Sequence, residues 1–196
     1  MSPELSASAP DREGGGVELG AFSDTRQLLE ADVLRTLAGP IAERRAMDGG
    51  GGFRRWLSWD QSCAYHEAGH LVIAWALGFH PWQASIKPDP TVKIGAGFVG
   101  GFASAGITKE PVLDLPPGSK LETDRQSVAR TCLVLALREE KRGWRGAVRV
   151  MNRLRLQARD LVEQYWAGIT ILAIALQQHG ELCRAQIERT LKPREV

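Results

Sequence analysis

The pattern of apolar and polar positions along the chain predicts a mainly helical fold. Apolar residues recur at helical spacing from Ser23 to Met47 and again from about Trp59 to Leu77. Three further helices are predicted from Lys120 to about Arg138, from about Ala147 to Gln178 and from about Arg184 to Leu191. The helix that ends at Leu77 becomes almost continuously apolar in its second half, which indicates a buried, central helix.

Short strands are predicted only between residues 83 and 102. Gln83–Lys87 is the first candidate, Pro88-Asp89-Pro90 is predicted to form a turn, and Thr91–Ile94 and Gly97–Phe102 follow. The many glycines weaken the later strands, because glycine destabilises a strand interior. We therefore expect a fold that is mainly α with a small β-sheet.

Glycine, proline and polar residues mark the boundaries of the segments. The first 22 residues are rich in Ser, Pro, Gly and acidic residues and lack an apolar run, so we expect a disordered tail without a signal peptide. Gly39-Pro40 is expected to kink or split the first helix. We divide the chain into a tail (residues 1–22), a helix (23–47), a glycine-rich linker (48–58), a folded domain (59–191) and a short tail (192–196).

Composition and cysteine content say little about the class of partner or the cellular location of this protein. Hydrophobic residues make up 43% and charged residues 24%, which is ordinary for a globular domain, and the net charge of +2 favours no class of partner. Three cysteines at unpatterned spacings favour a reducing, cytoplasmic setting over a disulfide scaffold. The longest apolar runs, Leu71–Phe79 and Ala167–Leu176, are shorter than the roughly 20 residues of a membrane span, so no membrane segment is expected.

The helix from about Trp59 carries its own start and stop signals. Ser58 and Gln61 fit a capping box, and Asp60 places a negative charge in the first turn, where the helix dipole favours it. Gly78 is well placed as the terminating residue, and Pro81 prevents continuation. A helix is therefore expected on local grounds alone.

Within this helix lies the sequence His66-Glu67-Ala68-Gly69-His70, an H-E-x-x-H motif. Positions i and i+4 lie on one helix face, so His66 and His70 can bind one metal ion, with Glu67 beside its water as general base. The alternative is a core helix with two hydrogen-bonded histidines. That alternative is costly, because burying two imidazoles and a carboxylate together without a metal is unfavourable.

A catalytic zinc site needs a third protein ligand. Asp124 falls on the same stripe as Leu121 and Val128 of the predicted helix, so its carboxylate would be buried and would need a partner. The residues alone leave a second interpretation open, in which Asp124 is an ordinary first-turn acid that serves the helix dipole. Weaker candidates for the third ligand are His80, Glu110, Asp114 and Glu122.

The segment Ala64–His70 resembles the peptidase domain of the FtsH family of zinc proteases, in which Glu-Ala-Gly typically stands between the histidines. The family's third ligand is an Asp that opens a later helix, in a pattern that Thr123–Ala129 resembles, with Thr in place of Asn. The resemblance covers about residues 60–191, including the C-terminal stretch Ala158–Leu191. It implies a zincin-like peptidase fold, one zinc per chain and Asp124 as third ligand.

The chain also departs from that family. FtsH proteins carry an ATP-driven unfoldase domain and membrane anchors, and neither these nor a glycine-rich phosphate loop is evident here. The expected substrates are therefore peptides or unfolded proteins, and any ATP dependence would need a separate ATPase chain. The family's helix of the type Leu-x-Gly-Arg-x-Ala-Glu is missing after the metal helix. A similar string, Leu37–Glu43, precedes it, and we hypothesise that this helix docks beside the helix of Asp124.

Zincins bind the substrate backbone along an edge strand near the metal helix. The candidate here is the stretch of Phe98, Val99, Gly100 and Gly101, up to Phe102. A glycine-rich surface loop is an equally good interpretation of the same residues.

The function expected from the sequence is that of a zinc metallopeptidase, in which His66, His70 and Asp124 bind zinc and Glu67 is the general base. The alternative is a catalytically silent, zinc-stabilised scaffold or adaptor that binds a protein partner. Nucleic acid is not the expected partner, although arginines recur at helical spacing, because such a run is usually a solvated face. The apolar stretch Val162–Leu176 is either central core or a contact between identical chains. The arginines are Arg138, Arg142, Arg145, Arg149 and Arg153.

Overall fold

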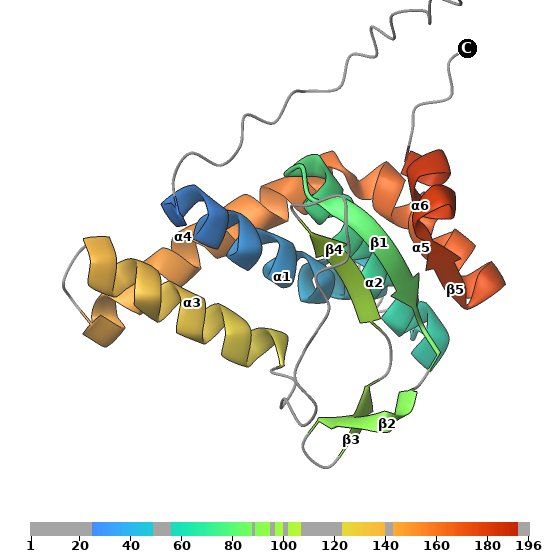
Figure 1. Cartoon of the computed structure of the whole chain (residues 1–196), viewed down its shortest axis with the longest axis horizontal. Coiled ribbons are helices and arrows are strands. Elements are labelled where there is room, and N and C mark those ends of the chain that lie inside the picture. The colour runs from blue at the N-terminus through green and yellow to red at the C-terminus, as the bar shows by residue number, and fades with distance from the viewer. Residues whose placement is uncertain are drawn as a thin grey trace, which may run out of the picture.

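A computed structural model describes residues 25–48, 56–87, 89–94, 97–99, 102–106, 123–139 and 143–191. These residues form helices and short strands in the order shown in Figure 1, and the chain is mainly helical, as expected. The helices are α1 (Thr25–Asp48), α2 (Trp59–Ala76), α3 (Asp124–Glu139), α4 (Gly143–Gln164), α5 (Trp166–His179) and α6 (Arg184–Leu191). The strands are β1 (His80–Ser85), β2 (Asp89–Ile94), β3 (Gly97–Val99), β4 (Phe102–Gly106) and β5 (Glu181–Cys183).

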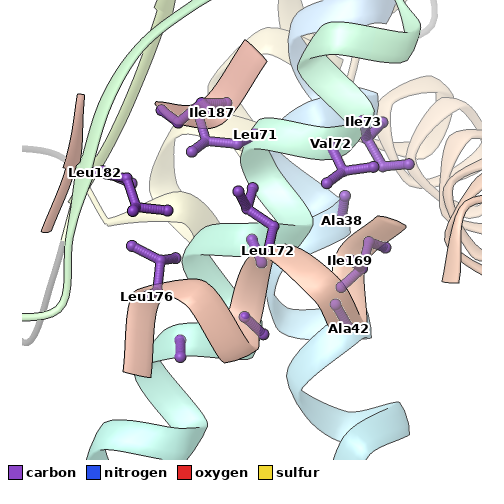
Figure 2. Packing of buried hydrophobic residues seen from close by; sticks show 14 of the residues in the cluster. Ala38, Ala42, Leu71, Val72, Ile73, Ile169, Leu172, Leu176, Leu182 and Ile187 are labelled. Carbon is purple, nitrogen blue, oxygen red and sulfur yellow. The ribbon is translucent and has the colours of Figure 1, made fainter. Parts of the chain in front are cut away.

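The main hydrophobic cluster surrounds α2. Side chains from α1, α5, α6 and β5 point toward this helix from different sides (Figure 2). Leu71 and Ile73 of α2 and Leu172 of α5 are completely buried, which confirms α2 as a central helix. The labelled members of the cluster are Ala38, Ala42, Leu71, Val72, Ile73, Ile169, Leu172, Leu176, Leu182 and Ile187.

A second hydrophobic cluster joins α3 to α1 and α4. It contains Val33 of α1, Val128 and Leu135 of α3, and Val150 and Leu154 of α4. The helices α1 and α4 contribute residues to both clusters, whereas α2 belongs to the first and α3 to the second. The two elements that carry the predicted metal ligands are therefore held by different parts of the core.

Two small antiparallel sheets complete the fold. One has the strand order β4-β1-β5, in which Ala84 pairs with Ala103 on one side and with Leu182 on the other. The other is a two-stranded ribbon of β2 and β3. Because β1 is central, β4 is an edge strand of the first sheet, and it packs beside α2.

The predicted single helix from Ala147 to Gln178 is wrong, because the structure divides it at Tyr165 into α4 and α5. The buried stripe of α4, which includes Val150 and Leu154, faces α1 and α3. The buried stripe of α5, which includes Ile169 and Leu172, faces α2. The last turn of α4 already reaches the first cluster through Val162, and α5 continues in that cluster after the break at Tyr165.

The first helix is not split at Gly39-Pro40, because α1 continues through Pro40. Proline removes one backbone donor, but the packing on α2 continues across this point. Ala38, Gly39 and Ala42 are buried, whereas Pro40 is exposed. The expected disordered tail, and residues 49–55 of the expected linker, lie outside the described residues.

The strand region differs in detail from the prediction. Asp89 and Pro90 belong to β2 and not to a turn, while Pro88 lies outside the described residues. The predicted strand Gly97–Phe102 is two elements in different sheets, β3 and the start of β4. The pairing of β2 with β3 shifts register between Asp89 and Lys93, so strict alternation could not locate these strands.

Among the described residues, no helix combines the length and apolar character that crossing a membrane requires. The three cysteines, Cys63, Cys132 and Cys183, are all free. A reducing environment stays a prediction.

Candidate metal centre

The start of α2 fixes the orientation of the H-E-x-x-H motif. The Ser58 hydroxyl accepts from the Gln61 backbone N–H at 3.2 Å, and the Gln61 side chain accepts from the Ser58 N–H at 3.0 Å. This confirms the predicted capping box. His66 and His70 follow one turn apart on the same face of α2, with ring centroids 4.7 Å apart and the ring planes at 80°.

The start of α3 differs from the predicted start at Lys120. Thr123 is non-helical and caps α3 through a reciprocal pair of hydrogen bonds with Gln126. The Thr123 hydroxyl accepts from the Gln126 N–H at 3.3 Å, and the Gln126 side chain accepts from the Thr123 N–H at 3.0 Å. Asp124 is consequently the first residue of α3. The Thr-x-x-Gln pattern at these positions was the signal for this start.

The three predicted ligands come together. The Oδ2 atom of Asp124 lies 3.0 Å from Nε2 of His66 and 3.1 Å from Nε2 of His70, and all three ligand atoms lie within 4.8 Å of one another. In a tetrahedral zinc site with bonds of about 2.0–2.1 Å, ligand atoms are roughly 3.3 Å apart. The two distances from Asp124 to the histidine nitrogens are therefore close to those in a zinc site.

The other ring nitrogen of each histidine is held by α1. Nδ1 of His66 lies 3.0 Å from Oε2 of Glu43, and Nδ1 of His70 lies 2.8 Å from the backbone oxygen of Arg35. Glu43 is itself held, because its Oε1 accepts a hydrogen bond from the Ser62 hydroxyl. Histidines that bind metals usually have such outer partners, which fix the tautomer and the ring orientation.

The tautomers determine what the triad can bind. The carbonyl of Arg35 can only accept, so Nδ1 of His70 must carry the hydrogen. A neutral His70 then directs its Nε2 lone pair at the carboxylate oxygen of Asp124, and the same holds for His66 when its Nδ1 donates to Glu43. Two lone pairs and a carboxylate oxygen thus converge, and only added protons or a cation can stabilise them. The donor set fits a divalent metal such as zinc.

One face of α1 provides these outer contacts. Arg35, Gly39 and Glu43 follow one another at i, i+4 and i+8, and they contact the two histidines, which are themselves four residues apart. At Gly39 the His70 ring takes the place of a side chain, since an added Cβ would lie 2.4 Å from Nε2 and 2.5 Å from Cε1. The string Leu37–Glu43 therefore lies beside the predicted metal ligands, and α1 also packs on α3, as hypothesised.

Glu67 lies next to the triad but has a different environment. It is 7% exposed, and no hydrogen bond to its carboxylate is found among the described residues. Burial raises the pKa of Glu67, and electrostatic interaction with His70 and His66 opposes that shift. A carboxylate without a fixed partner and with a raised pKa is suited to accept a proton near neutral pH.

The charges of the triad are strongly coupled. Burial alone would lower the pKa of His66, but its hydrogen bonds with Asp124 and Glu43 outweigh burial and raise the pKa to about 10. Burial alone would raise the pKa of Asp124, but its hydrogen bonds with His66 and His70 hold that pKa well below its usual range. The hydrogen bond with His66 likewise lowers the pKa of Glu43. Without a metal, protonated His66 and ionised Asp124 stabilise each other.

Other candidate residues lie away from the triad or outside the described residues. His80 begins β1 and is not part of the ligand group. Cys63 is not part of it either, and burial raises the pKa of its thiol to about 11, so the thiol is protonated at neutral pH. Glu110, Asp114 and Glu122 lie outside the described residues.

The predicted substrate-binding residues are only partly described. Phe98 and Val99 lie in β3, which pairs with β2, and Gly100 and Gly101 lie outside the described residues. The edge strand beside α2 is β4, which begins directly after this stretch at Phe102. Whether Phe98 to Gly101 bind substrate stays a prediction.

The arginine stripe does not lie on one continuous helix. Arg138 is on α3, Arg145, Arg149 and Arg153 are on α4, and Arg142 lies outside the described residues. Arg153 pairs with Glu30 of α1 at 2.6 Å. The structure thus adds nothing in favour of a nucleic-acid partner.

In comparisons with known proteins, no protein-family model, no curated protein and no solved structure matches this chain.

Proposed function

We propose that this chain is a zinc-dependent metallopeptidase with a zincin-like fold, in which His66, His70 and Asp124 bind one zinc ion. One observation carries the proposal: both Nε2 atoms converge on Oδ2 of Asp124, while a backbone carbonyl and a carboxylate hold both Nδ1 atoms. A structural zinc usually has four protein ligands. Among the described residues three ligands gather, which leaves one position for water.

Each residue has a distinct role in the proposed reaction. A zinc ion in this site would supply a Lewis acid and would lower the pKa of a water to about 7. Glu67 would accept a proton from the attacking water and donate it to the leaving amine. The water oxygen forms a bond to the peptide carbon, the C–N bond breaks, and the products are a carboxylate and an amine. Glu43 and the Arg35 carbonyl would hold the two imidazoles in the orientation that binding needs.

The proposed substrates are peptides or unfolded protein segments. An extended segment can pair with an edge strand, and the edge strand β4 lies beside the helix that carries His66 and His70. A separate ATPase chain would be needed for folded substrates. A cytoplasmic location belongs to the same proposal.

The test is the zinc content of the purified chain together with cleavage of casein. We expect about one zinc per chain, a strong loss of zinc in Asp124→Asn, and loss of cleavage with retained zinc in Glu67→Gln. The matched control for Asp124→Asn is Asp160→Asn, since Asp160 is an exposed aspartate on α4 outside the ligand group. Cleavage that persists in Glu67→Gln would contradict the proposed mechanism. Zinc binding without cleavage would favour a zinc-stabilised scaffold.

A further inference from the structure

Two neighbouring stripes of α1 face α2. The stripe of Arg35, Gly39 and Glu43 contacts the ligand histidines, and the stripe of Ala38 and Ala42 packs on the rest of α2. In Figure 2 the side chains of Ala38 and Ala42 point from α1 toward α2 and Ile169 of α5. Arg45 continues the second stripe, three residues after Ala42.

The second stripe consists of small residues. A Cβ added to Gly69 would lie 2.7 Å from the backbone oxygen of Ala38 and 2.8 Å from the Cβ of Ala42. The two helices therefore approach very closely, with little side-chain interdigitation. In most helix pairs, large interlocking side chains fix how far one helix is shifted along the other. Ala38, Ala42 and Gly69 are too small to do this, so other residues must fix the register of α1 against α2.

Arg45 makes a larger contact, which reaches α2 through Trp166. Its guanidinium carbon lies 4.0 Å from the ring centroid of Trp166 at the start of α5, and the Trp166 ring stacks on Tyr65 of α2 at 5.6 Å with an interplanar angle of 10°. Glu163 of α4 holds the guanidinium by two hydrogen bonds of 2.6 Å. Four helices thus meet at this contact, which we call the Arg45–Trp166 stack and define as Arg45, Tyr65, Glu163 and Trp166.

The stack is adjacent to the outer contacts of the proposed metal site. Arg45 is two residues from Glu43 on α1, and Tyr65 directly precedes His66 on α2. We propose that Trp166 and Arg45 are positioning residues, which fix the register of α1 against α2 and thereby hold Glu43 and the Arg35 carbonyl against the ligand imidazoles. This inference rests on the proposed zinc site and goes beyond it, because neither residue touches a ligand.

The test is zinc affinity, measured by competition with a chromogenic chelator, together with the absorption spectrum of the cobalt-loaded chain. We expect Trp166→Leu to weaken zinc binding by about 10-fold and to change the cobalt spectrum, as loss of outer contacts does. Trp166→Phe keeps an aromatic ring for stacking and is expected to restore both. Arg45→Gln is a milder second variant, which should weaken zinc binding in the same direction.

The matched control is Trp82→Leu. Trp82 of β1 also lies beneath an arginine, with the Arg184 guanidinium carbon 5.3 Å from its ring centroid, and Arg184 is likewise paired with a glutamate, Glu188. This contact lies between β1 and α6, whereas the hydrogen-bond partners that the structure shows for the ligand histidines lie on α1 and α3. Zinc affinity and the cobalt spectrum should therefore be unchanged in the control.

A double variant separates positioning from general stability. If Trp166 acts in part through Glu43, then Trp166→Leu should weaken zinc binding less in a Glu43→Ala background than in the unaltered chain, since the contact of Glu43 with His66 is already removed there. Two results would overturn this inference without affecting the proposed zinc site. One is an equal loss of zinc affinity in both backgrounds, and the other is unaltered zinc affinity in Trp166→Leu and Arg45→Gln. Failure of the unaltered chain to bind zinc would overturn it together with the proposed function.

Discussion

The His70 imidazole lies against the Cα of Gly39, in the space that a side chain at that position would fill. A Cβ there would be 2.4 Å from Nε2, which is closer than real Cβ atoms approach a neighbour. We predict that Gly39→Ala displaces the ring from the Arg35 carbonyl and weakens zinc binding by at least about 10-fold. The measurement is zinc affinity by chelator competition.

Gly168 in α5 provides the control for this substitution. A Cβ on Gly168 would make ordinary contacts of 3.6 Å with Val72 and 3.9 Å with Leu191. Glycine in a helix interior is destabilising by about 0.5–1 kcal/mol relative to alanine, so Gly168→Ala should leave zinc affinity unchanged and slightly raise Tm. Normal zinc affinity in Gly39→Ala would show that the ring is free to move away.

Glu43 is predicted to act on zinc through His66. Removal of its carboxylate in Glu43→Ala also leaves the Ser62 hydroxyl without its acceptor, whereas Glu43→Gln keeps an oxygen near both partners. We expect a loss of zinc affinity of about 10- to 100-fold for Glu43→Ala and a smaller loss for Glu43→Gln. Isothermal titration with zinc measures both. The control is Glu188→Ala, because Glu188 is a half-buried glutamate on α6 that pairs with Arg184 and not with a histidine.

The stability of the metal-free chain should depend on pH with a definite sign. The pKa of His66 is raised from 6.5 to about 10 in the folded chain, so its contribution is complete below about pH 6.5 and is lost as the pH rises toward about 10. The pKa of Asp124 is lowered from 3.8, so its contribution is present above about pH 3.8 and is lost in acid. In EDTA, Tm should therefore fall between about pH 6.5 and 10.

Zinc should reverse this trend. Metal binding requires unprotonated histidines, so the increase in Tm caused by zinc should grow over the same pH range. Thermal unfolding at a series of pH values, with EDTA or with zinc, measures both effects. In EDTA a flat Tm from pH 6.5 to 10 would contradict the coupling between His66 and Asp124, and His66→Gln should flatten the profile.

Metal binding should slow amide hydrogen exchange in α3 more than in helices away from the site. Val128, Leu135 and their neighbours in α3 pack with α1 and α4, whereas Asp124 reaches across to α2. We expect zinc to slow amide hydrogen exchange in peptides that cover Thr123–Leu133 and to leave α6 unchanged. In Asp124→Asn this protection should be absent. Uniform protection of the whole chain would instead indicate a general effect of metal binding on stability.

Local patterns in the sequence were sufficient to predict α2 and the triad. The capping box at Ser58 and the i, i+4 spacing of the histidines act within a few residues, and the structure confirms both expectations. The start of α3 was harder, because two potential capping boxes, at Ser119 and Thr123, lie four residues apart. Local helix propensity does not distinguish the two possible starts. In the structure the helix starts after Thr123, which makes Asp124 its first residue.

The outer contacts could not be derived from local patterns. Glu43 lies 23 residues before His66, and Arg35 lies 35 residues before His70. The string Leu37–Glu43 was visible in the sequence, but its position depends on how α1 packs on α2. The break at Tyr165 was missed because the sequence places neither glycine nor proline at that residue or directly beside it.

The separation of the proposed ligands along the chain would give a bound metal a further role. His66 and Asp124 are 58 residues apart, and they belong to helices in different hydrophobic clusters. A metal that bridges them closes a loop of that length, as a disulfide would, and loss of chain entropy in the unfolded state would then stabilise the fold by up to about 4 kcal/mol. Unlike a disulfide, this crosslink does not depend on an oxidising environment, and a chelator removes it. The lifetime of the folded chain would therefore follow the supply of metal.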